Sequence, residues 1–239
     1  LDARGIALRY FPLPAVAQTF LQSLAPTHRR GTCRAYQTAL RNFHAWLHDS
    51  RLSLQRLRRH HLEQWLLALH DRRLHASSRT HMILSLRSYL RWLAERHDLH
   101  ADPEDLLRSS DLPKLPAYLP RPLPPDVDRE LQRRLADSPD RRWLGLLLMR
   151  HTGLRIGELA ALEYDCAHQD PQGHWLLKVP LGKLNTERLV PLTERAVRLI
   201  GRLRENRPPP HTYLLERAPG QPVPYADFRD ALQVASEGL

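Results

Sequence analysis

The stretch "HTGLRIGELAALEYDC", His151–Cys166, joins an apolar helix to the start of another and holds a charged side chain near the joint. Arg155 stands among leucines and an isoleucine, whose side chains we expect to pack inward. A guanidinium held by such neighbours loses little further freedom on binding, and its fork can grip a phosphate through two parallel hydrogen bonds. The spacing also fits a second interpretation, in which Arg155 and Glu158 form an ordinary salt bridge within one helix.

The residues around this stretch predict a mixed pattern in which helices dominate. The signals for helices are proline or acidic residues near the start and glycine near the end. The signal for strands is an alternating apolar segment between two turns. Helices are expected over 124–136, 141–152 (closed by a left-handed Gly153), 155–162, 193–206 (with Thr193 as N-cap) and 225–239 (burying Phe228, Leu232 and Ala235). Strands are expected over 174–180 and 188–192, as a small antiparallel sheet with turns at 170–173 and 181–187.

The first 110 residues carry helical periodicity throughout. Helices are expected near 15–24, over 31–50, from about Arg56 to residue 73, and over 76–97, where Ser77 or Ser78 is the expected N-cap. The last of them should bury Ile83, Leu86, Leu90 and Leu93. Arginines recur on the faces that these cores leave free, namely Arg34, Arg41, Arg79, Arg87 and Arg91.

A proline-rich segment divides the chain. Residues 111–125 hold six prolines, too many for a helix or a central strand, and such a segment is typical of a semi-stiff connector. The sequence therefore predicts a helical domain over 1–110, a linker over 111–125 and a second domain over 126–239.

The charge favours a polyanionic partner, most simply nucleic acid. The net charge is +10, and residues 1–110 contribute +8 of it, with 17 arginines against 9 acidic residues. A GC-rich genome, which favours arginine, is the alternative explanation. No apolar run approaches the length of a membrane span, the N-terminal residues lack the layout of a signal peptide, and the two cysteines are far apart. We expect a reduced cytoplasmic, nucleoid-associated protein, without metal or cofactor, since none of the 14 histidines has ligand spacing.

The segment "LGKLNTERLVPL", residues 181–192, places Lys183 at the tip of the predicted hairpin. Only three of the 36 basic residues are lysines, so an ammonium at this position is unusual for this chain. A lysine can give up its proton and act as a general acid, which an arginine practically cannot do. A solvated turn lysine is the plain alternative.

Taken together, "HTGLRIGELAAL" and "GKLNTERLVPL" resemble the tyrosine recombinase (phage integrase) family. The resemblance extends over nearly the whole chain, through the helical segment "SSRTHMILSLRSYLRWL" and the "LPRPL" of the linker. It implies a mainly α fold with a small antiparallel β-sheet, in which a SAM-like helical core-binding domain precedes an α+β catalytic domain.

The resemblance also assigns roles. Arg155 matches the first of two catalytic arginines, Lys183 matches the hairpin lysine that protonates the departing 5′ oxygen, and Glu158 matches a supporting acidic position. The expected phosphate contacts are Arg34, Arg41, Arg79, Arg87, Arg91 and the hairpin residue Arg188. In this family a tyrosine attacks DNA to give a 3′-phosphotyrosine without metal or ATP, and four protomers on two double-stranded DNA sites exchange strands.

The sequence departs from the family pattern after Arg155. The family's H-x-x-R motif occurs only earlier, at His48–Arg51 and His70–Arg73, and Tyr213 and Tyr225 precede the expected place of the nucleophile. We therefore expect a catalytic domain without its C-terminal part, which binds DNA but does not cleave it. The alternative from a different class is a non-catalytic DNA-binding accessory or inhibitor protein related to these recombinases.

Overall fold

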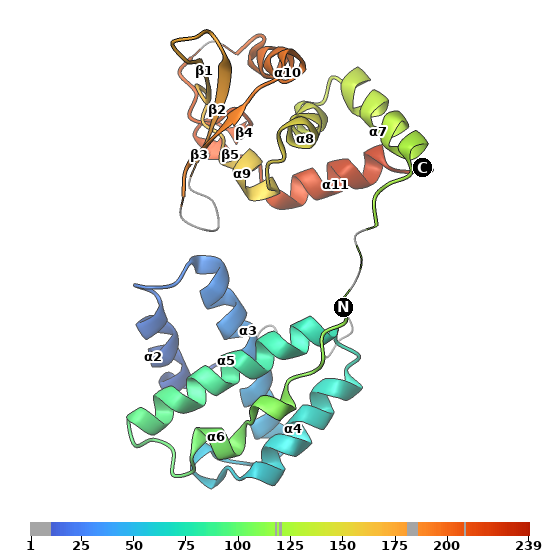
Figure 1. Ribbon diagram of the computed structural model, residues 1–239. Helices are drawn as coiled ribbons and strands as arrows, with labels where there is room; N and C mark the ends of the chain where they lie inside the picture. The colour runs from blue at the N-terminus through green and yellow to red at the C-terminus, as the bar shows by residue number, and fades with distance from the viewer. Residues whose placement is uncertain (1–10, 118, 120, 181–185, 208) are drawn as a thin grey trace. The chain divides into compact units, whose positions relative to one another are not determined.

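The computed structural model describes residues 11–117, 119, 121–180, 186–207 and 209–239 (Figure 1). Its contacts divide the chain into two compact units, Leu1–Leu119 and Pro120–Leu239. The division falls inside the proline-rich segment. The protein is mainly helical with small antiparallel sheets, as the sequence predicted.

The first unit is built of helices alone in its described part. In chain order they are α2 (Ala15–Leu24), α3 (Arg30–Asp49), the 3-10 turn η1 (Leu54–Arg56), α4 (Arg59–Asp71), α5 (Ala76–Glu95), α6 (Pro103–Leu106) and η2 (Ser109–Asp111). The two long helices, α3 and α5, pack on each other, and α6 lies against both α4 and α5.

Aromatic side chains fill the centre of this unit. Phe43 of α3 meets Trp65 of α4 edge to face, with ring centroids 5.7 Å apart, and both side chains are fully buried. The expected stripe of α5 is buried as predicted, together with Tyr89. Buried rings of this size contribute much of the apolar area that stabilises the core. They therefore hold the helices, and the basic faces of these helices, in fixed positions.

The second unit combines helices with two small sheets. Its elements are α7 (Pro125–Asp137), α8 (Arg141–Thr152), α9 (Ile156–Ala160), β1 (Ala167–Gln169), β2 (Trp175–Val179), β3 (Arg188–Pro191), α10 (Glu194–Arg204), β4 (Glu216–Ala218), β5 (Gln221–Pro222) and α11 (Tyr225–Ala235). The larger sheet has the order β1-β2-β3, with both pairs antiparallel, and β4 pairs with β5.

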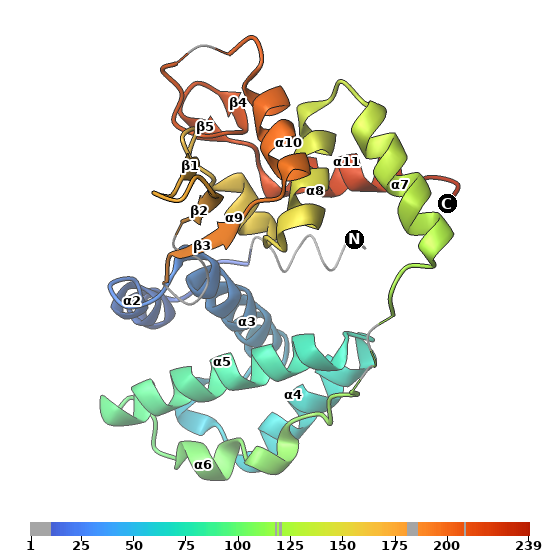
Figure 2. The same ribbon diagram turned by 45° about the horizontal axis from the view of Figure 1, so that its top comes forward.

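Helix α8 forms the centre of the second unit. It packs against α7, α10 and α11, and Figures 1 and 2 both show α11 next to it. The leucines of α8 are buried, and Gly145 lets the side chain of Leu215 approach the helix closely. The end of α8, where the Arg155 segment begins, is therefore anchored on several sides.

Some local predictions were wrong. Helix α4 begins at Arg59 and not near Arg56, because a 3-10 turn precedes it. Helix α5 is capped by His75, whose side chain accepts from the amide of Ser77. In α11, Ala231 is buried in place of Leu232, which is 38% exposed. The helix expected over 155–162 is shorter, Ile156–Ala160.

Candidate functional site

The joint between α8 and α9 fixes the backbone of Arg155. Gly153 ends α8 with a left-handed backbone, at φ +66°, and its amide donates to the carbonyl of Met149. Leu154 then turns into the core, where only 5% of it is exposed. Arg155 follows as the extended N-cap residue of α9. Its side chain is 62% exposed, so a rigid backbone presents a guanidinium to solvent.

Glu158 ties three groups together at this joint. Its Oε2 accepts from the backbone amide of Arg155 at 2.8 Å, which is the glutamate half of a capping box. Its Oε1 accepts from Nη1 of Arg155 at 2.9 Å. Arg188, the first residue of β3, donates from Nη1 and Nη2 to both oxygens, at 2.8 and 2.9 Å. One carboxylate thus links α9 to the sheet.

Electrostatics keep this carboxylate ionised. Arg188 above all, and then the amide and guanidinium of Arg155, lower the pKa of Glu158 to about 2, against the opposing effect of burial. In return, Glu158 raises the pKa of Arg188. The Glu158 side chain is only 3% exposed, whereas that of Arg155 is 62% exposed and that of Arg188 is half-buried. A buried anion holding two cations makes a site that can bind a further anion through the remaining N–H groups.

The structure brings together Arg155, Glu158 and Arg188 from the predicted residues. Arg188 was predicted as a DNA contact, and its two Nη atoms donate to Glu158. The Arg155–Glu158 pair considered as an alternative is present, but it belongs to a larger group. Lys183 falls in residues 181–185, outside the described part of the chain. The strands on either side of these residues are described, and Val179 of β2 lies opposite Arg188 of β3.

The arginines predicted in the first unit lie on its helices. Arg34 and Arg41 lie on α3, the first of them exposed and the second half-buried. Arg79 lies in the first turn of α5, where its Nη1 lies 2.9 Å from Nδ1 of His70. The first turns of α3 and α4 carry basic residues and no acidic ones, although the positive end of the helix dipole favours acidic side chains there.

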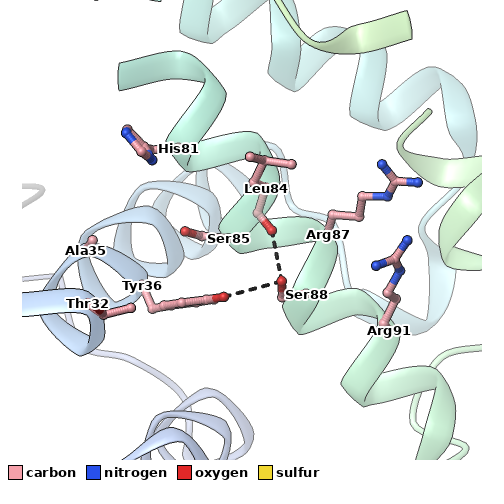
Figure 3. A pocket seen from close by; sticks show the side chains of 9 residues that line it. All are labelled: Thr32, Ala35, Tyr36, His81, Leu84, Ser85, Arg87, Ser88 and Arg91. Carbon is pink, nitrogen blue, oxygen red and sulfur yellow. Dashed lines mark hydrogen bonds between the residues drawn. The ribbon is translucent and has the colours of Figure 1, made fainter. Parts of the chain in front are cut away.

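Arg87 and Arg91 line a groove between α3 and α5. This cavity of about 340 Å³ is lined by polar, basic and apolar side chains, and Figure 3 shows both arginines at one end of it, with Tyr36 on the α3 side. Across the groove, the hydroxyl of Tyr36 donates to Oγ of Ser88 at 3.4 Å. The groove combines hydrogen-bonding groups with the exposed Leu84.

Sequence reasoning missed the acidic residue at this groove. Glu104 of α6 pairs with both Arg87 and Arg91. It lies 17 and 13 positions from them, so no helical spacing indicates the contact. Its only signal in the sequence is its place in "DPED", a short acidic segment after a strongly basic helix.

Two features are absent from the described residues. No group of histidine, cysteine or acidic side chains there could hold a metal ion. No helix there has the length and apolar character needed to cross a membrane.

Two family models match this chain. The phage integrase N-terminal SAM-like domain matches residues 17–97, and the phage integrase family matches residues 128–238. The chain belongs to the phage integrase family of tyrosine recombinases. In this tyrosine recombinase, the first match includes the arginines on α3 and α5, and the second includes the joint at Arg155.

Curated relatives agree with this membership. Tyrosine recombinase XerD of Shewanella oneidensis is 31% identical over 171 residues, which cover 70% of this chain and 54% of the relative. Tyrosine recombinase XerC of Xanthomonas axonopodis pv. citri is 35% identical, over 57% of this chain and 43% of the relative. Transposase B from transposon PsiTn554 of Staphylococcus aureus is 30% identical, over 53% and 21%. The tyrosine recombinase chain spans about half or less of these relatives.

Solved structures share the fold. A lambda integrase tetramer bound to a Holliday junction superposes with a TM-score of 0.74 at 16% identity, covering 94% of this chain and 63% of that one. The site-specific recombinase XerH bound to its difH substrate gives 0.65 at 15% identity, covering 92% and 67%. At this identity the likeness shows the tyrosine recombinase fold.

Proposed function

We propose that this chain is a DNA-clamping and partly catalytic portion of a site-specific DNA recombinase. In this proposal the protein breaks and rejoins DNA through a 3′-phosphotyrosine and acts on double-stranded DNA in the cytoplasm, associated with the nucleoid. The observation that carries it is Arg155, anchored through its backbone and one Nη to the buried Glu158 while most of its side chain faces solvent.

Arg155 is the proposed catalytic arginine. When a phosphodiester is attacked, its non-bridging oxygens gain negative charge, and a preorganised guanidinium stabilises that charge without having to reorient. Glu158 acts as a positioning residue, because it holds Arg155 and Arg188 by one carboxylate. Lys183 is proposed as the acid that protonates the departing 5′ oxygen.

No tyrosine among these residues is assigned as the nucleophile. No H-x-x-R motif follows Arg155 in the sequence, and the only such motifs begin at His48 and His70. We propose that this chain by itself binds DNA without forming the covalent adduct, and that the second arginine and the tyrosine are not among its residues.

The arginines of α3 and α5 are the proposed phosphate contacts. Arg34, Arg41, Arg79, Arg87 and Arg91 lie on two helices that pack on each other, and the unit that holds them carries most of the positive charge. Phosphate contacts fix the position of a protein on DNA and make its affinity depend on salt. By likeness to relatives solved as DNA-bound assemblies, including a tetramer on a Holliday junction, we propose a homotetramer on two DNA sites.

Covalent trapping tests the catalytic assignment. The protein expressed from its whole gene is mixed with a nicked suicide substrate, on which a recombinase accumulates as a phosphotyrosyl adduct. Arg155→Ala should lower adduct formation at least about a hundredfold while the Kd for DNA changes by less than about threefold. The matched control is Arg150→Ala, because Arg150 lies on α8 nearby, is 57% exposed and pairs with Asp128.

Two results would contradict the assignment. Equal losses of DNA binding and of trapping would make Arg155 a structural arginine. No adduct with the unaltered protein would favour the alternative function, a DNA-binding accessory or inhibitor protein.

The acid role of Lys183 has its own test. Lys183→Ala should stop cleavage of ordinary DNA and regain it on DNA with a bridging 5′ sulfur, because a thiolate departs without protonation. Lys178→Ala is the control, since Lys178 of β2 pairs with Glu163 and has no assigned role. A Lys183→Ala protein that stays inactive on the sulfur substrate would remove Lys183 from the acid role.

A further inference from the structure

Glu104 lies against the two arginines that line the groove between α3 and α5. Its Oε1 accepts from Nε of Arg91 at 2.7 Å, and its Oε2 accepts from Nη2 of Arg87. Both carboxylate oxygens are thus engaged, one by each guanidinium. Arg87 also donates from Nη1 to Oγ of Ser109 at 3.3 Å.

The protein backbone places Glu104 firmly. It lies in the short helix α6, where the side chain of Asp102 accepts from the amide of Glu104 at 2.9 Å and Pro103 fixes the first turn. Leu106, in the same helix, is 1% exposed and anchors α6 to the core of the first unit. Arg87 and then Arg91 hold the pKa of Glu104 below its usual range, so the carboxylate is ionised at neutral pH.

A second anion can approach the contact from the side of Arg91. Glu104 is 47% exposed and Arg91 is 52% exposed, whereas the Arg87 side chain is 16% exposed. Figure 3 shows the guanidinium groups of Arg87 and Arg91 side by side and pointing away from Tyr36. A DNA phosphate presents two charged oxygens, as Glu104 does, and can replace it on the same donors.

We propose that Glu104 occupies the phosphate-binding donors of Arg87 and Arg91 and thereby limits the affinity of the first unit for DNA. The inference rests on the proposed function, in which these two arginines contact phosphates. On any DNA a phosphate must displace Glu104 before it reaches them. Phosphates are the same on every sequence, so this cost lowers the affinity for every DNA by a similar factor.

Removing the charge of Glu104 tests the inference. The 239-residue protein and its Glu104→Gln variant are titrated with a random-sequence DNA duplex of about 30 base pairs over a series of salt concentrations, with fluorescence anisotropy as the readout. Glu104→Gln should bind about tenfold more tightly at low salt. Its slope of log K against log salt should be steeper by about 1–2, since each further phosphate that the protein neutralises adds about 0.9.

Two further variants separate this effect from a change of net charge. Glu63→Gln removes the same charge from α4, at a glutamate that pairs with Arg59 and lies outside the groove. It should change the affinity by less than about twofold. In a protein with Arg87→Ala and Arg91→Ala, the added Glu104→Gln change should have no effect on affinity or slope. Thermal unfolding shows that each variant is folded.

Each result either supports or overturns the inference. An affinity for the random duplex that Glu104→Gln leaves unchanged or lowers overturns the inference, as does an equal increase for Glu63→Gln or an increase that persists without the two arginines. These results leave the proposed function intact, because the unaltered protein still binds DNA. Absence of binding by every variant overturns the proposed function, and the inference falls with it.

Discussion

At the scale of the residue, Glu158 is the group on which the candidate site depends. Its carboxylate accepts four hydrogen bonds, from the amide and guanidinium of Arg155 and from two nitrogens of Arg188. Bonds to a buried charge are stronger than neutral ones, and removing the charge leaves two arginines with a neutral acceptor. The orientation of Arg155 toward solvent follows from this arrangement.

Glu158→Gln should lower the free energy of unfolding by about 2 kcal/mol at pH 7. The pKa of Glu158 is lowered to about 2 in the folded protein from an ordinary 4.5, so its contribution is complete above about pH 4.5 and disappears as the pH falls toward 2. The difference in urea midpoint between the two proteins should therefore shrink as the pH falls below 4.5. A difference that stays constant with pH would mean that the Glu158 charge does not stabilise the fold.

The residue scale also shows what sequence can predict. Arg155 and Glu158 are three positions apart, and the turn of a helix makes such a pair foreseeable. Arg188 lies 30 positions from Glu158, so their contact depends on how the sheet packs beside α9, and no local spacing encodes it. The same holds for Glu104, which reaches α5 only because the chain turns back after that helix.

At the scale of the element, the end of α8 sets the direction in which the chain enters the site. Gly153→Ala should destabilise the protein by about 1 kcal/mol, because alanine is strained at its φ of +66°. Gly201→Ala is the matched control in α10, where a Cβ meets no atom within 4 Å. That change should stabilise the helix by about 0.5–1 kcal/mol. Equal effects of both changes on the urea midpoint would contradict this account of the joint.

Long elements were predicted well and short ones poorly. Helices α3, α5, α8 and α10 each have enough turns for an apolar stripe to show in the sequence, and the left-handed Gly153 and the cap at Thr193 are present as predicted. Strands β1, β4 and β5 have two or three residues, too few for an alternating pattern, and the sequence did not indicate them. Their pairing depends on neighbours that pack around them.

At the scale of the whole molecule, the chain consists of two units with separate cores joined near residue 119. Lys114 is exposed and lies outside the helices, between η2 and α7. Limited trypsin digestion should therefore cut first after Lys114, since most arginines lie in helices whose backbone is hydrogen-bonded. Mass spectrometry of the first fragments checks this. Early cuts within α3 or α5 would contradict the independent stability of the first unit.

The first 110 residues carry most of the net positive charge of the molecule. This uneven distribution supports the proposal that the protein clamps DNA. The most direct test of this claim is the affinity of the 239-residue protein for a DNA duplex measured over a range of salt concentrations. With at least three arginine–phosphate contacts, log K should fall with log salt at a slope of about −3 or steeper. Arg34→Ala together with Arg79→Ala should flatten the slope by about 2. A slope near zero, or no binding to DNA at low salt, would contradict the account.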